Sequence, residues 1–90
     1  MYANGFNIGQ KYEGTVLWFN ENFGYGFVET PEIRIEGTNS FFVHYSKIQS
    51  EEGFKALSKG AIVTFELAKT IKGIQCVNVR EIKVVQAKVV

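Results

Sequence analysis

A strand-length run in which glycine alternates with aromatic residues constrains this chain more than any other feature. From residue 24 to residue 28 the order is Gly-Tyr-Gly-Phe-Val. Successive side chains of an extended strand point to opposite faces, so Tyr25 and Phe27 share one face and Val28 lies on the other. Gly26, between the rings, lets a second layer of backbone come close. The run therefore predicts a strand whose aromatic face lies opposite its core face.

A second aromatic run, at residues 41–45, repeats this pattern. On an extended strand, Phe41 and Val43 point to one face, and Phe42 and His44 point to the other. Two such strands side by side make one aromatic surface. That surface is either buried, in a sandwich core or a dimer interface, or exposed as a stacking surface for unpaired bases. Glycine and histidine among the rings favour the exposed surface, because single-strand binders present aromatic faces in this way.

The length and composition indicate one small soluble domain. Ninety residues leave no room for a second core, and 46% hydrophobic with 21% charged residues is typical of a globular protein. The sequence has no apolar run near the roughly 20 residues of a membrane helix, and its first residues lack a signal-peptide pattern. We therefore expect a cytoplasmic protein without a membrane partner.

Cysteine and histidine are too few for several kinds of chemistry. One cysteine, Cys76, forms no internal disulfide, and with one histidine it cannot supply a structural zinc site. We interpret Cys76 as a small apolar filler in a strand. The chain has no Walker-type loop, and the spacing of His44 and Ser46 is common by chance. We predict no enzyme activity, no metal site and no cofactor.

Patterning predicts five short strands, a turn of helix at residues 46–48 and no longer helix. The strands are expected at residues 12–19, 24–29, 41–45, 61–68 and 74–84, which favours a small antiparallel barrel. Strict alternation puts Val16 and Trp18 on one face, so Trp18 joins the aromatic face only if its strand bulges near Leu17. In the last strand we expect Val77 and Val79 to point inward.

The remaining segments connect or flank this barrel. Residues 1–10 are predicted to be a flexible arm, residues 11–84 the domain and residues 85–90 a C-terminal extension. Residues 30–40 are interpreted as an extended hairpin that projects past the barrel, with contact of Arg34 to phosphate as the functional alternative. In the connection before residue 60, Phe54 either anchors the loop on the core or reaches over a ligand.

Four motifs, in order, resemble the cold-shock domain family. They are the runs 14–20, 23–28, 42–45 and 52–54, the last followed by Leu57. The resemblance extends from about residue 12 to about residue 84. It implies an OB-fold, the five-stranded antiparallel barrel with a bulge near Leu17. The connection at residues 30–40 is longer than the family usually has there.

The resemblance also implies a nucleic-acid-binding site. Its stacking groups would be Trp18, Phe19, Tyr25, Phe27, Phe42, His44, Tyr45 and Phe54, and their polar or basic neighbours would be Asn20, Lys55 and Lys72. The family commonly has lysine where this chain has Thr15, Leu17 and Phe23. We expect weaker attraction to phosphate as a result. Phe23 either adds a ring to the site or lies across an apolar patch.

Two functions of different classes follow. The first is binding of single-stranded RNA and DNA with little sequence preference, as an RNA chaperone or a regulator of transcription or translation. The second is a protein-interaction adaptor that uses the aromatic face. A net charge of +1 and a pI near 7.8 give the adaptor some support. We expect a monomer, with a homodimer formed by strand exchange as the alternative.

Overall fold

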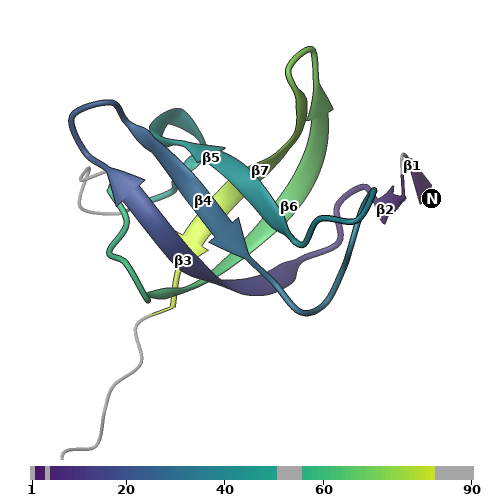
Figure 1. The fold of residues 1–90 in the computed structure, drawn as a ribbon, viewed down its shortest axis with the longest axis horizontal. Coiled ribbons are helices and arrows are strands. Elements are labelled where there is room, and N and C mark those ends of the chain that lie inside the picture. Colours follow the sequence, from purple (N-terminus) through teal and green to yellow (C-terminus); the bar gives the residue numbers. More distant parts are fainter. Residues whose placement is uncertain (1, 4, 51–55, 83–90) are drawn as a thin grey trace, which may run out of the picture.

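The computed structural model describes residues 2, 3, 5–50 and 56–82, and five strands within these ranges form a closed β-barrel. Its strands are β3 (Tyr12–Asn20), β4 (Tyr25–Glu29), β5 (Ser40–His44), β6 (Ile62–Thr70) and β7 (Gly73–Glu81). Hydrogen bonds join them in the order β3-β4-β5-β7-β6, and β6 returns to β3 (Figure 1). One 3-10 turn, η1 (Tyr45–Lys47), is the sole helical element in the described ranges. The predicted all-β OB-fold barrel is confirmed.

One strand pair departs from the antiparallel pattern. Strands β5 and β7 run parallel and pair at Phe42 and Gln75, whereas the other neighbouring pairs are antiparallel. A closed ring with an odd number of strands cannot alternate direction throughout. One parallel contact is therefore required, and it lies between β5 and β7, which are not consecutive in the chain.

The core consists of the inward positions of all five strands. Val63, Phe65 and Leu67 alternate along β6 and are buried, as their spacing predicts. Ile48, directly after η1, and Leu57, before β6, are buried too and belong to the same core. The same cluster contains Tyr12, Val16, Val28, Phe41, Val43, Cys76 and Val79.

Strand β7 corrects one prediction. Val77 is only partly buried, whereas Cys76 and Val79 are fully buried. Thr64 pairs with Arg80 and Glu66 pairs with Val77, so β7 has one more residue than β6 between these two pairs. Asn78, in this extra step, has a positive φ of 51°. This β-bulge reverses the alternation, so Cys76 rather than Val77 points inward. The interpretation of Cys76 as a buried apolar filler is confirmed.

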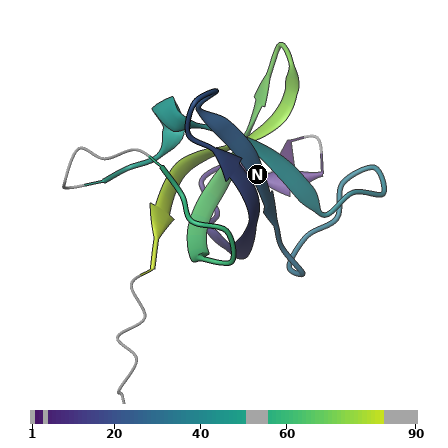
Figure 2. The same cartoon turned by 60° about the vertical axis from the view of Figure 1, so that its left-hand side comes forward.

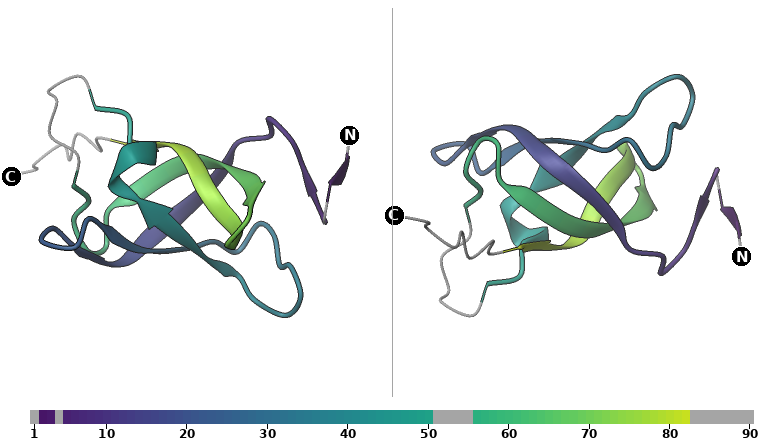
Figure 3. Two further views of the ribbon diagram at one scale, coloured as in Figure 1. Left: turned by 90° about the horizontal axis from the view of Figure 1, so that it is seen from above. Right: turned by 90° about the horizontal axis from the view of Figure 1, so that it is seen from below.

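The N-terminal residues contribute to the core, although the sequence predicts a flexible arm there. Strands β1 (Tyr2–Ala3) and β2 (Phe6–Asn7) form a small antiparallel hairpin at one end of the barrel (Figure 3). Phe6 is buried in the core cluster, while Ile8 is 65% exposed. Phe6 therefore packs this segment against the barrel, a contact that the spacing of apolar residues in the segment does not predict. The predicted domain bounds themselves stay a prediction.

The β4–β5 loop, residues 30–39, projects beside the barrel (Figure 2). The extended hairpin predicted here is reduced to one pairing, Ile35 with Thr38. The base of the loop is held by side chains: the buried Thr30 hydroxyl donates to the Glu13 carbonyl at 2.6 Å, and the Glu32 carboxylate accepts the Glu13 N–H at 3.0 Å. The loop therefore has fixed anchors on β3.

Candidate nucleic-acid interface

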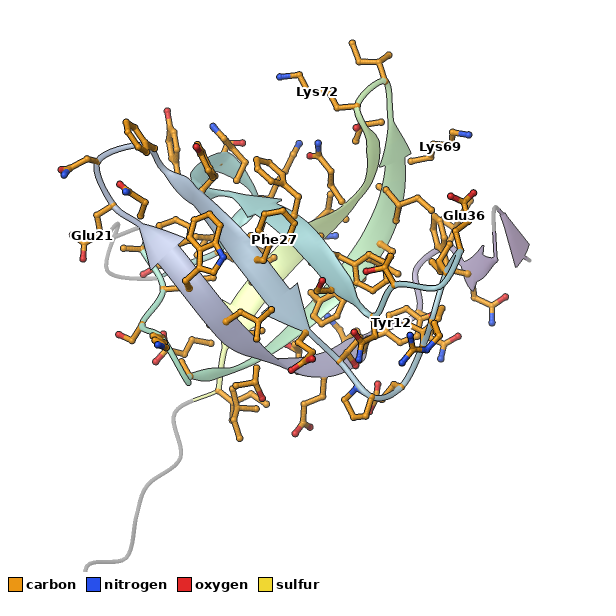
Figure 4. All side chains as sticks on the ribbon, viewed as in Figure 1. Tyr12, Glu21, Phe27, Glu36, Lys69 and Lys72 are labelled. Atoms are coloured by element: carbon orange, nitrogen blue, oxygen red, sulfur yellow. The ribbon has the colours of Figure 1, made fainter. Side chains whose placement is uncertain are left out.

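Five aromatic rings form a connected layer on the outer face of β3, β4 and β5. We call this layer the ring surface, and it consists of Trp18, Phe23, Tyr25, Phe27 and Phe42. Phe27 lies near its middle (Figure 4), with ring centroids 5.5 Å from Trp18 and 5.8 Å from Phe42. Tyr25 lies 5.5 Å from Phe42 and 5.9 Å from Trp18. The rings touch one another at the surface, not in the core.

Strand alternation confirms which face holds the rings. Val28 and Val43 are fully buried, whereas Tyr25, Phe27 and Phe42 are only partly buried. Phe27 pairs directly with Phe42 across β4 and β5. One face of this part of the sheet therefore packs the core, and the opposite face presents the rings.

A β-bulge brings Trp18 onto that face. Val16 pairs with Val28 and Trp18 pairs with Phe27, so β3 uses two steps where β4 uses one. Leu17 is the extra residue. Val16 stays buried while Trp18 is 42% exposed, which confirms the predicted bulge.

The β3–β4 turn holds Phe23 over Tyr25. The Asn20 side-chain oxygen accepts the Phe23 N–H at 2.9 Å, and the Asn20 carbonyl accepts the Gly24 N–H at 2.7 Å. Gly24 has a positive φ of 77°, where glycine is favoured. The Phe23 ring lies nearly parallel to Tyr25, at 14° and 5.9 Å, and is 66% exposed. Phe23 thus extends the ring surface, and the Asn20 side chain stabilises the turn by a hydrogen bond to its backbone.

His44 and Tyr45 form a separate pair beside the ring surface. Their centroids are 4.5 Å apart, and His44 pairs with Tyr25 across the strands. His44 Nδ1 accepts the Ser46 N–H at 3.2 Å and lies 2.9 Å from the Ser46 hydroxyl. With Nδ1 an acceptor, the neutral ring carries its proton on Nε2. The cap on η1 therefore fixes the orientation of the histidine.

Phe19 differs in position from the other predicted stacking groups. Its ring is partly buried and packs against the core cluster. The absence of a side chain at Gly26 permits this, since a Cβ there would lie 2.8 Å from the Phe19 Cα and would overlap the Trp18 carbonyl oxygen. Gly26 thus serves the close backbone approach expected from the sequence.

Of the basic residues predicted for the site, Lys72 is described, and it lies outside the ring surface. Lys72 is exposed at the β6–β7 turn, and Lys69 is exposed near the end of β6 (Figure 4). Phe54 and Lys55 lie outside the described residues, so their predicted roles stay predictions. Arg34, whose contact to phosphate is the functional alternative for the β4–β5 loop, donates to the Gly37 carbonyl at 2.9 Å within its own loop.

The structure adds residues that sequence reasoning did not select. A pocket between the β4–β5 loop and the β6–β7 hairpin is lined by Phe27 and Phe42 together with Glu36, Lys69 and Gln75. Glu36 and Lys69 come from segments far apart in the chain. Gln75 pairs directly with Phe42 in the parallel contact that closes the barrel, so the register of β5 and β7 places it beside the rings.

Other site types have little support in the part of the chain that is described. No group of three or more metal-ligating side chains occurs among those residues. Burial raises the pKa of the Cys76 thiol far above its usual range, which keeps the thiol protonated and unreactive. Within the described ranges, no helix is long and apolar enough to span a membrane.

A closed five-stranded barrel with an outward layer of aromatic rings defines an OB-fold of the nucleic-acid-binding class. A family model described as the 'cold-shock' DNA-binding domain matches residues 12–82. The chain belongs to the cold-shock domain family.

Named relatives agree with this assignment. The cold shock-like protein CspE of Buchnera aphidicola subsp. Acyrthosiphon pisum is 48% identical over 69 residues, which are 77% of this chain and 93% of that protein. The cold shock protein CspA of Staphylococcus saprophyticus is 45% identical over 67 residues, or 74% of this chain and 92% of that protein. Membership supports nucleic-acid binding as the general activity of this chain.

Proposed function

We propose that this protein binds single-stranded RNA and DNA by stacking unpaired bases on the ring surface, with little overall sequence preference. The observation that carries the proposal is the outward layer of five rings, four on strands whose inward positions form the core and one, Phe23, on the β3–β4 turn. Every base has an aromatic face, and stacking contributes about 1 to 3 kcal/mol for each base. A paired duplex offers no such faces.

A cellular role follows from the same physics. A protein that binds unpaired bases stabilises the single-stranded state, because it binds that state and not the duplex. We propose that the chain acts as an RNA chaperone or a regulator of transcription or translation. A cytoplasmic location and a monomeric state are part of this proposal.

The binding residues of the proposal fall into two groups. The ring surface, with His44 and Tyr45, supplies the stacking groups, and Lys72 supplies a positive charge. Phe54 and Lys55 are included from the resemblance alone. Phe19 is the weakest member of the set, because its ring packs against the core.

Alanine variants at Phe27 and Phe42 test the proposal. Each should weaken binding of a seven-nucleotide oligothymidine by about 1 to 3 kcal/mol, measured by equilibrium titration. Val43, a buried neighbour of Phe42 on the opposite face, provides the matched control. Val43→Ala should lower the melting temperature and leave the affinity of the folded protein unchanged.

The adaptor alternative makes the opposite prediction. If the ring surface binds another protein, Phe27→Ala and Phe42→Ala leave the affinity for oligothymidine as it is in the native protein. If both variants unfold, the rings are structural and the proposal is wrong.

A further inference from the structure

A pocket continues the ring surface toward the β4–β5 loop. Its volume is about 670 Å³, within the range of about 300 to 1,000 Å³ typical of small-ligand sites. The loop forms one wall and the β6–β7 hairpin forms the other, while Phe27 and Phe42 line the pocket and also belong to the ring surface. The pocket and the ring surface are therefore contiguous at these two rings.

The walls combine an apolar surface with opposite charges. Ile35 and Ile74 are apolar lining residues, Glu36 is on the loop wall, and Lys69 and Lys72 are on the hairpin wall. Glu36 and Lys69 lie on the same side of Phe27 (Figure 4). Within the described residues, no ion pair joins Glu36 to either lysine. A flat ring with polar edges and a phosphate attached matches this combination better than a purely apolar ligand does.

Glu36 has an uncommon backbone conformation. Its φ is 51° and that of Gly37 is 82°, and the flanking Ile35 and Thr38 exchange backbone hydrogen bonds of 2.9 and 3.0 Å. A two-residue turn of this kind favours Asn-Gly, so glutamate is an unfavourable choice for folding. A strained residue at a ligand site is a reason to look for a function of its side chain.

The turn is also held firmly in place. Ile35 is buried in the core cluster, and the Arg34 side chain donates to the Gly37 carbonyl at 2.9 Å. Gly5, beside the buried Phe6, lies next to Ile35, since a Cβ on Gly5 would lie 3.7 Å from the Ile35 side chain. The N-terminal hairpin therefore supports the wall that carries Glu36.

We propose that this pocket binds one base of the single strand and that it favours guanine. The proposal rests on the proposed function and adds a preference at one position of an otherwise sequence-tolerant surface. Guanine presents two adjacent N–H donors on its Watson–Crick edge, and a carboxylate accepts two parallel hydrogen bonds. Adenine, cytosine and thymine each place an acceptor beside their donor, which a carboxylate repels. Lys69 and Lys72 then lie on the wall opposite Glu36, where they pair with phosphate.

Oligonucleotides with one substituted position test this preference. A seven-nucleotide oligothymidine is compared with variants that carry guanine, adenine or inosine at each position in turn. Guanine at the preferred position should raise the affinity of the native protein about fivefold or more, the lower end of the discrimination of a bidentate pair. Inosine lacks the amino group of guanine and should recover only part of this gain.

Variants of Glu36 assign the preference to its carboxylate. In Glu36→Gln the advantage of guanine over the other bases, measured within that variant, should fall to about twofold or less, because one acceptor becomes a donor. Glu36→Asn keeps the turn, since asparagine tolerates the positive φ, and should lose the preference as well. Glu21→Gln makes the same charge change at the opposite side of Phe27 and should have no effect (Figure 4).

The possible failures are distinguishable. If oligothymidine binds but guanine has no advantage at any position, or if the advantage persists in both Glu36 variants, the pocket proposal is wrong and the ring surface stands. If no oligonucleotide binds, the proposed function fails and the pocket proposal fails with it.

Discussion

Phe23 shows how one residue changes the balance of forces at this site. The family commonly has lysine at this position, and here a ring stacks on Tyr25 and stays 66% exposed. At this end of the ring surface, an aromatic ring that can stack on a base stands where the family commonly has a positive charge. Since Thr15 and Leu17 also stand where lysine is common, affinity should depend on stacking more than on attraction to phosphate.

The salt dependence of binding tests this balance. For single strands, the slope of log K against log salt is about −0.7 for each phosphate contacted. We expect a shallow slope that corresponds to about one to three contacts. Phe23→Lys should steepen the slope by up to about 0.7 relative to Phe23→Gln, a variant of similar length without the charge. A steep native slope, equal in both variants, would contradict this placement of the binding face.

At the scale of single elements, two β-bulges decide which side chains face outward. The bulge at Leu17 brings Trp18 onto the ring surface, and the bulge at Asn78 turns Cys76 inward and Val77 outward. The first could be predicted because the family resemblance places Trp18 among the stacking groups, and strict alternation would put Trp18 on the same face as Val16. The second has no such signal, because both Cys76 and Val77 are apolar and either fits a core.

Thiol accessibility checks the register of β7. Burial raises the pKa of the Cys76 thiol, so the native protein should react with a thiol reagent only when it unfolds. A Cys76→Ala, Val77→Cys variant places the thiol at a partly exposed position and should react much faster. Equal protection of both thiols would show that Val77 also points inward.

The same thiol predicts a dependence of stability on pH. An unfolded cysteine loses its proton near pH 8.5, while the raised pKa keeps the folded thiol protonated. Above that pH the unfolded state therefore binds fewer protons than the folded state. The free energy of unfolding should fall as pH rises beyond about 8.5, and this fall should be smaller in Cys76→Ala.

At the scale of the whole molecule, the core extends beyond the family's matched segment. The family model begins at residue 12, yet Phe6 is buried with the barrel residues. Phe6→Ala should lower the free energy of unfolding by about 3 to 5 kcal/mol, as for other buried phenylalanines. Chemical denaturation measures this loss. Ile8→Ala, at an exposed neighbour, should change it by less than about 0.5 kcal/mol, and equal effects would contradict the burial of Phe6.

Much of this architecture can be predicted from the sequence, because period-two alternation specifies both strand and face. The order of glycine, ring and valine in β4 predicts the ring surface, and the spacing of Val63, Phe65 and Leu67 predicts the inward side of β6. The parallel contact follows only from closure of an odd-stranded barrel. The pocket depends on how the β4–β5 loop folds back beside the β6–β7 hairpin, and no local pattern encodes such a long-range contact.

The most direct test of the central claim uses Trp18, which lies on the ring surface and is 42% exposed. Its emission is recorded during titration with a seven-nucleotide single strand and, separately, with the same sequence as a paired duplex. The single strand should quench the emission and bind much more tightly than the duplex, because bases stack on the rings only when they are unpaired. Equal binding of the duplex, or binding of the single strand that leaves Trp18 emission unchanged, would contradict the claim that the ring surface binds unpaired bases.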